Sequence, residues 1–306
     1  MRPAAPLLHA DLPRAILTIC AGVAFLVSND AIAKLLTERY DPVQIIFIRN
    51  WLAVPMIAAL VIALYGRAAL RTRHLKLHAL RGLLMLAGAY LYFSAIAVMP
   101  LAEATVLVFS APIFITALSV PILGEAVGWK RWGAVLLGFA GVLITVQPGG
   151  AAFHPASLMV LGTAVLYALF MMLARFIGRD EGLFTMMFFV VMFPGLYATP
   201  FALAVWAPVQ AGDIGLFLAI AVLGSLGITL IGHAFRLAPA AVVAPFDYTA
   251  LIWAAGFGWL IWGDLPGPWT VVGAGVIIAS GLIIVWRERA GGRATATAPP
   301  HRVPPR

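Results

Sequence analysis

The first half of this chain recurs as a weak copy about 140 residues further on. The clearest stretch pairs residues 100–141 with 239–281, and one extra residue in the turn 265–268 shifts the register without breaking it. The matched residues are prolines, glycines and tryptophans: Pro100 with Pro239, Gly124 with Gly263, Trp129 with Trp269, Gly133 with Gly273, and Gly141 with Gly281. A register that survives an insertion indicates an internal repeat, so both halves are expected to share one fold.

The composition indicates that this fold lies in a lipid bilayer rather than in water. The chain is 63% hydrophobic and 10% charged, whereas soluble domains have about 25% charged residues. Runs of about 20 apolar residues predict membrane-spanning helices. Ten such runs occur: 15–37, 42–64, 78–98, 101–123, 132–146, 158–176, 183–206, 214–235, 240–262 and 269–285. These long runs are unlike the short alternating strands of a membrane β-barrel.

Each repeat therefore carries five spans, and an odd number inverts the second repeat relative to the first. We predict an all-α integral membrane protein with ten transmembrane helices in two five-helix inverted-topology repeats, an architecture typical of secondary transporters. The expected segments are a cytoplasmic amino-terminal segment 1–14, a first repeat 15–148, a second repeat 149–289 and a disordered cytoplasmic tail 290–306.

The distribution of basic residues predicts the orientation. With the amino terminus inside, the loops expected in the cytoplasm hold nearly all of the lysines and arginines, and Arg39 alone lies outside the membrane on the other side. This bias follows the positive-inside rule and places both termini in the cytoplasm of a bacterial-type inner (plasma) membrane. The net charge of +8 is thus a topology signal. No basic face interleaved with aromatic residues indicates nucleic-acid binding.

Several motifs resemble a known family. They are Ala95 to Thr105, Pro112, Leu123-Gly124-Glu125, Trp132-Gly133, and Gly138 to Val142. Together they are similar to the EamA repeat of the drug/metabolite transporter superfamily. Ser28-Asn29-Asp30 with Lys34 and Arg49 resembles the branch that includes S-adenosylmethionine and riboflavin carriers. The resemblance implies a transporter but fixes neither solute nor direction. The second repeat departs from the pattern, with Asp264 for Glu125 and Leu251 for Pro112.

Five ionisable residues lie inside predicted spans: Asp30, Lys34, Arg49, Glu103 and Asp247. Such a group costs about 2.5–3.5 kcal/mol on insertion scales, so each needs a partner or a water-filled space. Asp30 and Lys34 are one helical turn apart and share a face, and Arg49 is expected at the depth of Asp30. Two roles stay open for Asp30 and Arg49, an ion pair that fixes packing or direct contacts with a solute. Lys34 and Glu103 could instead reach the membrane interface.

Asp247 is the residue expected to carry coupling or cation recognition. It follows Pro245, which frees backbone groups in a helix, and precedes Tyr248, so an irregular polar point is expected within this span. Trp262 is interpreted as an interfacial anchor and Asp264 as a turn residue that caps the next helix. Other candidate residues for solute contact are Asn29, Tyr90, Tyr92, Tyr248 and Trp253.

We therefore expect a secondary transporter that moves a small amphipathic zwitterionic or cationic metabolite by alternating access. The solute could be an amino-acid derivative, a nucleoside-like cofactor, a metallophore or a drug. A phosphate-binding G-x-x-x-x-G-K-[ST] motif does not occur, so the energy should come from the solute or an ion gradient, with protons one option. A non-transporting receptor or assembly subunit is the alternative.

An enzyme is not expected, because no nucleophile, base or metal set converges within the spans and Cys20 is a single cysteine. We expect no cofactor and no metal. The expected partners are the solute and membrane lipid, with the protein as a monomer or a homodimer.

Overall fold

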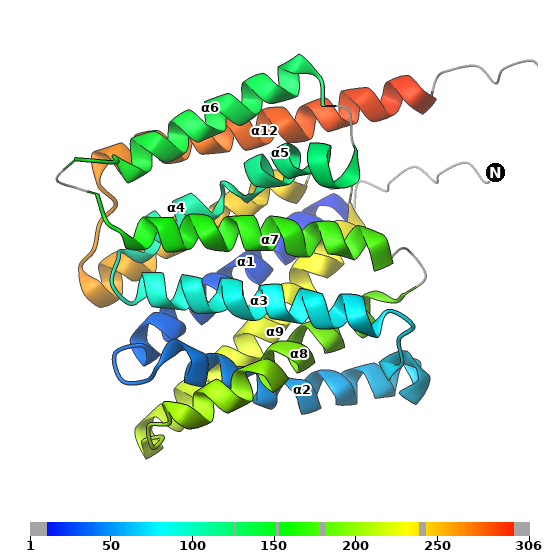
Figure 1. The fold of residues 1–306 in the computed structure, drawn as a ribbon, viewed down its shortest axis with the longest axis vertical. Helices are drawn as coiled ribbons and strands as arrows, with labels where there is room; N and C mark the ends of the chain where they lie inside the picture. The colour runs from blue at the N-terminus through cyan, green and yellow to red at the C-terminus, as the bar shows by residue number, and fades with distance from the viewer. Residues whose placement is uncertain (1–10, 125–126, 151–152, 178–180, 239–242, 297–306) are drawn as a thin grey trace, which may run out of the picture.

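The computed structural model describes residues 11–124, 127–150, 153–177, 181–238 and 243–296. These residues form a bundle of helices (Figure 1), and no strand occurs among them. The elements are α1 (Asp11–Leu36), α2 (Pro42–Tyr65), η1 (Arg67–Leu70), α3 (Leu75–Ile96), α4 (Leu101–Val108), α5 (Ala111–Leu123), α6 (Trp129–Val146), α7 (Ala156–Ile177), α8 (Leu183–Ala204), η2 (Ala211–Asp213), α9 (Ile214–Leu237), η3 (Ala244–Tyr248), α11 (Thr249–Phe257), η4 (Gly258–Trp262) and α12 (Pro268–Ala296). Residues 1–10 and 297–306, in the predicted terminal segments, lie outside the described ranges.

Within the described ranges, eight helical stretches are long and apolar enough to cross a membrane, with α4 and α5 together forming one of them. They coincide with the first eight predicted spans. At the predicted tenth span, α12 contains a shorter apolar stretch, Pro268–Ile284. The predicted ninth span is divided: a 3-10 turn (η3), an α-helix (α11) and a π-helical turn (η4) follow one another. The fold is therefore that of a multi-pass membrane protein.

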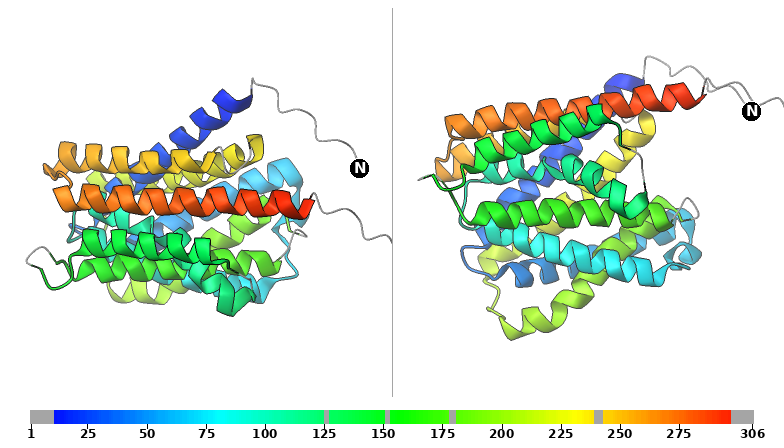
Figure 2. Two further views of the ribbon diagram at one scale, coloured as in Figure 1. Left: turned by 90° about the horizontal axis from the view of Figure 1, so that it is seen from above. Right: turned by 45° about the horizontal axis from the view of Figure 1, so that its top comes forward.

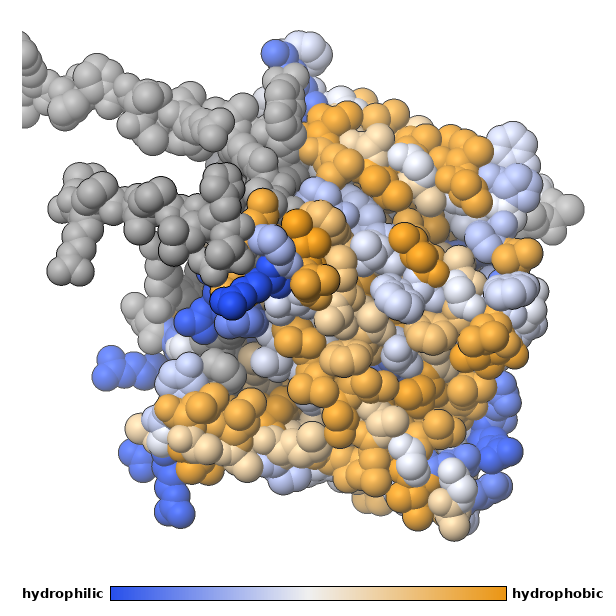
Figure 3. All heavy atoms as spheres, turned by 180° about the vertical axis from the view of Figure 1, so that it is seen from behind, coloured by the Kyte–Doolittle hydropathy of each residue, from blue (hydrophilic) through white to orange (hydrophobic). Residues whose placement is uncertain are grey.

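The surface has the apolar character that a bilayer requires. Apolar atoms cover most of one face of the bundle, and the polar residues gather towards its two ends (Figure 3). Large side chains such as Leu136 on α6 and Leu260 on η4 are 67% and 73% exposed. Soluble monomers rarely expose continuous apolar surface of this extent, so this belt is best covered by lipid.

Most of the tight helix pairs join one half of the chain to the other. Within the described residues, α1 packs along α9, α3 along α7, α2 along α8 and α6 along α12. Figures 1 and 2 show α6 and α12 side by side along one flank of the bundle. The largest core cluster takes buried residues from both halves, for example Ile19 and Ile45 from the first and Ile220 and Ile277 from the second. Neither half thus encloses its own core.

Two of these pairs cross at glycines. A Cβ atom added to Gly22 of α1 would lie 3.0 Å from the carbonyl oxygen of Gly227 on α9. The same relation holds between Gly141 of α6 and Gly273 of α12, again at 3.0 Å. Small residues at a crossing let two backbones approach closely, which is how apolar helices associate in lipid.

The repeat is visible in the backbone at its matched turns. α5 ends at Gly124 with φ 67° and ψ 21°, and η4 ends at Gly263 with φ 73° and ψ 10°. Both are left-handed conformations that glycine adopts without steric cost. The match of Gly124 with Gly263 in the sequence therefore corresponds to the same helix-ending geometry.

The loops 37–41, 97–100, 205–213 and 263–267 lie at one end of the bundle, here named the Asp264 end (left in Figure 1). A buried polar network ties the two halves together there. Asp213 accepts hydrogen bonds from Tyr40 at 2.7 Å and from Arg39 at 3.1 Å. Gln44 exchanges two hydrogen bonds with the backbone of Ala207, at 2.7 and 2.9 Å.

The opposite end, here named the Glu181 end, contains the loops 66–74 and 181–182. Glu181 accepts a hydrogen bond from Thr72 and lies 2.6 Å from Nε2 of the buried His78. Burial alone would raise the pKa of the Glu181 carboxyl, but the hydrogen bonds from Thr72 and His78 outweigh burial and hold this pKa below its usual 4.5. This carboxylate thus fastens the loop between α7 and α8 to the start of α3.

The glycine crossing gives a first prediction. Gly227→Ala should lower the free energy of unfolding of the purified protein by about 1–3 kcal/mol. The new methyl group would lie 2.8 Å from Leu26 and 2.9 Å from the Gly22 carbonyl oxygen. Gly215→Ala on the same helix is the control, since nothing lies within 4 Å of its Cβ position. Thermal unfolding in detergent measures both. Equal stability of the two variants would contradict the close packing of α1 on α9.

The Glu181 cluster gives a second prediction. Glu181→Gln should destabilise the protein by about 1–3 kcal/mol, because a charge-assisted hydrogen bond to a buried partner is lost. A carboxyl with a lowered pKa in the folded state contributes stability above its usual pKa of 4.5 and loses it as the pH falls through the folded-state value. The stability gap between wild type and Glu181→Gln should therefore close on acidification. Glu38→Gln, which alters an exposed carboxylate, is the control. A gap that does not depend on pH would contradict this role.

Candidate functional site

The interior of the bundle contains a pair of helix breaks. In the first half the helix is interrupted at Phe109 and Ser110, between α4 and α5. In the second half the 3-10 turn η3 changes to α-helix at Tyr248 and Thr249. Phe109 and Tyr248 occupy matched positions of the repeat, and their rings contact each other with centroids 4.8 Å apart. Irregular backbone inside a span occurs where it is buried in protein or lines a cavity.

Asp247 lies at this break, next to Tyr248. It is half-buried, on a segment that packs against α1. Tyr167 of α7 and Tyr248 are near enough for its charge to act on them. In the described ranges, no lysine, arginine or hydrogen-bond donor pairs with the Asp247 carboxylate. A charge in this position is available to a ligand.

A second polar group surrounds Asp30 on α1. Tyr92 of α3 donates a hydrogen bond to Asp30 at 3.2 Å, and the side-chain amide of Asn29 donates another at 3.0 Å. Arg49 of α2 stacks on the ring of Phe93 at 5.4 Å. Its charge acts on Asp30, but among the described residues these two do not form a direct ion pair. The guanidinium and the carboxylate are thus neighbours with separate immediate partners.

One acceptor of the Asp30 group has no donor. Oδ1 of Asn29 is buried without a hydrogen-bond partner in the described part of the chain. It faces α9 at Gly224, where a Cβ would lie 2.8 Å from it. Buried acceptors that lack donors are costly unless a ligand or water satisfies them. With Asp30 and Asp247 also accepting, this interior favours a ligand that carries donors or positive charge.

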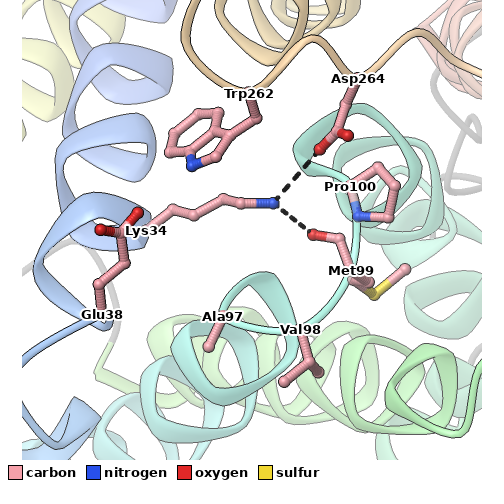
Figure 4. A pocket seen from close by; sticks show the side chains of 8 residues that line it. All are labelled: Lys34, Glu38, Ala97, Val98, Met99, Pro100, Trp262 and Asp264. Carbon is pink, nitrogen blue, oxygen red and sulfur yellow. Dashed lines mark hydrogen bonds and ion pairs between the residues drawn. The ribbon is translucent and has the colours of Figure 1, made fainter.

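A third group lies at the Asp264 end (Figure 4). The ammonium of Lys34 donates to the carbonyl oxygen of Met99 at 2.8 Å, lies 3.8 Å from the Asp264 carboxylate, and lies 4.8 Å from the ring centre of Trp262. A cavity of about 330 Å³ adjoins it. The lining residues are Lys34, Glu38, Ala97, Val98, Met99, Pro100, Trp262 and Asp264.

The remaining predicted residues lie apart from these groups. Glu103 accepts a hydrogen bond from Thr270 of α12 at 3.4 Å, a further link between the halves near the Asp264 end. Tyr90 is 41% exposed, on the side of α3 away from Tyr92, and Trp253 is 42% exposed and stacks on Phe257. The structure therefore joins Asn29, Asp30 and Tyr92, and separately joins Lys34 to residues that the sequence interpretation had given structural roles.

Those residues are Trp262 and Asp264, and Met99 adds a third contact through its backbone carbonyl. Sequence reasoning missed their contact with Lys34 because the partners are far apart in the chain. The requirement that a lysine inside a span needs a partner was the only available signal, and it does not say which acidic residue supplies it. Within the described ranges, no three His, Cys, Asp or Glu side chains gather closely enough to hold a metal ion.

Comparison with known proteins identifies several relatives of similar length. An S-adenosylmethionine uptake transporter of Rickettsia bellii is 28% identical over 86% of this chain and 90% of that protein. A riboflavin transporter of Vibrio cholerae is 29% identical over 93% and 97%. A pseudopaline exporter of Pseudomonas aeruginosa is 27% identical over 90% and 96%. The relatives thus include proteins named for uptake and for export.

A solved crystal structure matches the fold with a TM-score of 0.59 at 19% identity, covering 91% of this chain and 98% of that chain. The model of the EamA-like transporter family matches twice, over residues 13–147 and 154–286. These two matches correspond to the two halves of the internal repeat. With nearly the whole described bundle covered, this chain belongs to the EamA-like transporter family.

Proposed function

We propose that this protein is a secondary transporter of the inner membrane that moves a small zwitterionic or cationic metabolite by alternating access. The observation that carries the proposal is the pair of matched helix breaks at Phe109 and Tyr248, with Asp247 beside them. Discontinuous helices at the interface of two repeats form the solute and ion sites of many secondary transporters. Membership of a transporter family supports the same function.

The helix pairing supports an inverted repeat of five spans in each half. If α1 is exchanged with α7 and α3 with α9, the pair α1–α9 becomes the pair α7–α3, which also packs tightly. The same exchange leaves α2–α8 and α6–α12 as pairs. A two-fold axis in the membrane plane would produce this pattern. In this arrangement the broken segment η3–α11–η4 and α12 are the ninth and tenth spans.

Basic residues support the orientation. In the described ranges, the Glu181 end holds Arg67, Arg71, Arg73, Lys76, Lys130 and Arg131 outside the apolar belt, whereas the loops of the Asp264 end hold Arg39 alone. The positive-inside rule then places the Glu181 end in the cytoplasm and the Asp264 end outside.

The acceptors of the interior support the solute class. Asp30, Asp247 and the free oxygen of Asn29 can accept from an ammonium or another donor group. Arg49 lies in the same region and can attract a carboxylate on the same solute. We propose Asp247 as the coupling group, because it is the carboxylate at the helix break.

The function has a direct test in Asp247→Asn. This change keeps the side-chain shape and removes the charge, so the protein should fold while solute flux in proteoliposomes falls about tenfold or more, the loss expected for one charge-assisted contact. S-adenosylmethionine and riboflavin are the first solutes to test, given the names of the relatives. Asp41→Asn is the control, since Asp41 caps α2 and Asn caps equally well.

Undiminished flux in Asp247→Asn would move the coupling site to Asp30. No saturable flux of any tested solute in wild-type proteoliposomes would favour the alternative of a receptor or assembly subunit, because a fold can be reused without its transport activity.

The orientation has its own prediction. Single cysteines at Gly128 and Leu265, in a Cys20→Ala background, should react with a membrane-impermeant thiol reagent from opposite sides of intact cells. Both positions are exposed, and Leu265 should react from outside. Permeabilised cells, in which both sites should label, provide the control. Labelling of both sites from outside in intact cells would contradict the inverted repeat.

A further inference from the structure

The ammonium of Lys34 occupies a site that any organic ammonium could fill. A carbonyl oxygen (Met99), a carboxylate (Asp264) and the face of an indole ring (Trp262) surround it, at 2.8, 3.8 and 4.8 Å. Figure 4 shows these three groups converging on Nζ from elements other than α1. An acceptor, an anion and an aromatic face are the three features with which proteins bind cationic groups.

This site is also a contact between the two halves of the chain. Lys34 belongs to α1 in the first half, whereas Trp262 is the last residue of η4 and Asp264 lies in the turn between η4 and α12 in the second. The Lys34 side chain is 9% exposed, but the Asp264 side chain is 37% exposed. The carboxylate can therefore be reached from water while the lysine is in place.

The cavity beside Lys34 provides the approach. At about 330 Å³ it falls in the lower part of the size range of small-molecule sites. Glu38, one turn beyond Lys34, contributes a second carboxylate to its wall and is exposed. The cavity wall thus combines two carboxylates with an indole ring, and Lys34 supplies the only cation among its lining residues.

We propose that this cavity is an entry site where the cationic group of the solute competes with Lys34 for Asp264 and Trp262. The solute ammonium takes the place of the lysine ammonium, Lys34 turns into the water-filled cavity, and the contact between the halves is released. Arrival of the right solute thereby favours opening of the Asp264 end. The inference rests on the proposed transport function and names the chemistry of its first step.

Exchange is physically reasonable here because the incoming cation replaces like with like. The number of charges beside Asp264 stays the same, and the released Lys34 is hydrated. A neutral solute of the same shape cannot replace the ammonium, since it would leave Asp264 without a cation. The site would thus select for charge before the solute reaches Asp30 or Asp247.

The test measures the chemical reactivity of Lys34 in the purified full-length protein. Choline is the probe, because its quaternary ammonium does not react with acylating reagents, and 3,3-dimethylbutan-1-ol is its uncharged counterpart. The rate at which each lysine is acetylated is followed by mass spectrometry. The exposed Lys76 and Lys130 serve as internal controls for the reagent and the fold.

The proposal predicts that choline raises the acetylation rate of Lys34 severalfold in a saturable manner, while the rates at Lys76 and Lys130 stay constant. The uncharged alcohol should have no effect. In Asp264→Asn the resident contact is weaker, so Lys34 should react faster without choline and respond little to it. Glu38→Gln should keep the response but require a higher choline concentration.

A rate at Lys34 that choline leaves unchanged or lowers would overturn the proposal, since a cation that binds without displacing the lysine would shield it. This measurement requires no solute flux, so its outcome is separate from that of the transport assays. Loss of flux in Asp247→Asn together with an unresponsive Lys34 would reject the entry site and keep the transporter.

Discussion

The whole fold depends on close contact between helices that belong to different halves of the chain. Gly22 against Gly227 and Gly141 against Gly273 bring backbones together at distances that a side chain would prevent. In lipid there is no hydrophobic force to hold apolar helices together, so packing at such points must supply the association. Because the core is shared, any movement of one half relative to the other must change the packing at these glycine crossings.

The polar contacts at the two ends differ in how easily they can break. Asp213 and Glu181 are 9% and 8% exposed at their side chains, and each is satisfied by more than one donor. Removing one partner from a buried pair of this kind is costly. Asp264, at 37%, is wetter and holds its lysine at 3.8 Å. The lysine is buried, but its carboxylate partner is partly exposed and accepts no side-chain hydrogen bond within the described ranges, so the Lys34 contact is the one best suited to opening in the proposed transport cycle.

Much of this arrangement could be predicted from the sequence because a bilayer imposes simple rules. Apolar length located the eight helical stretches that are long enough to span a membrane within the described ranges. The cost of a buried charge singled out Asp30, Lys34, Arg49, Glu103 and Asp247. Pro245 and Asp247 indicated an irregular ninth span, and the structure confirms that its described part changes from 3-10 to α to π geometry. The break at Ser110 was not predicted, although Pro112 follows it closely.

The sequence could not specify which way a side chain faces or which distant residue it contacts. Tyr90 and Tyr92 are two residues apart, so they face opposite sides of a helix with 3.6 residues per turn and only one can reach Asp30. Nothing in the sequence selects between them, because that choice depends on where α1 lies. The contact of Lys34 with Asp264 likewise joins residues 230 positions apart. Such a contact depends on how the two repeats pack against each other, and local sequence patterns do not predict it.

The two repeats match at their helix breaks and at the glycines that end their helices, but not in their charge pattern. Phe109 and Tyr248 are matched and in contact, whereas the residue before Tyr248 is Asp247 and the residue before Phe109 is Val108. The carboxylate is therefore attached to only one of the two equivalent segments. If the two repeats are related by symmetry, the protein can open at either end. A charge present in only one repeat then gives the two open conformations different free energies. A cation bound at Asp247 would alter that difference, and such a bias is what a carrier needs in order to couple movement to its load.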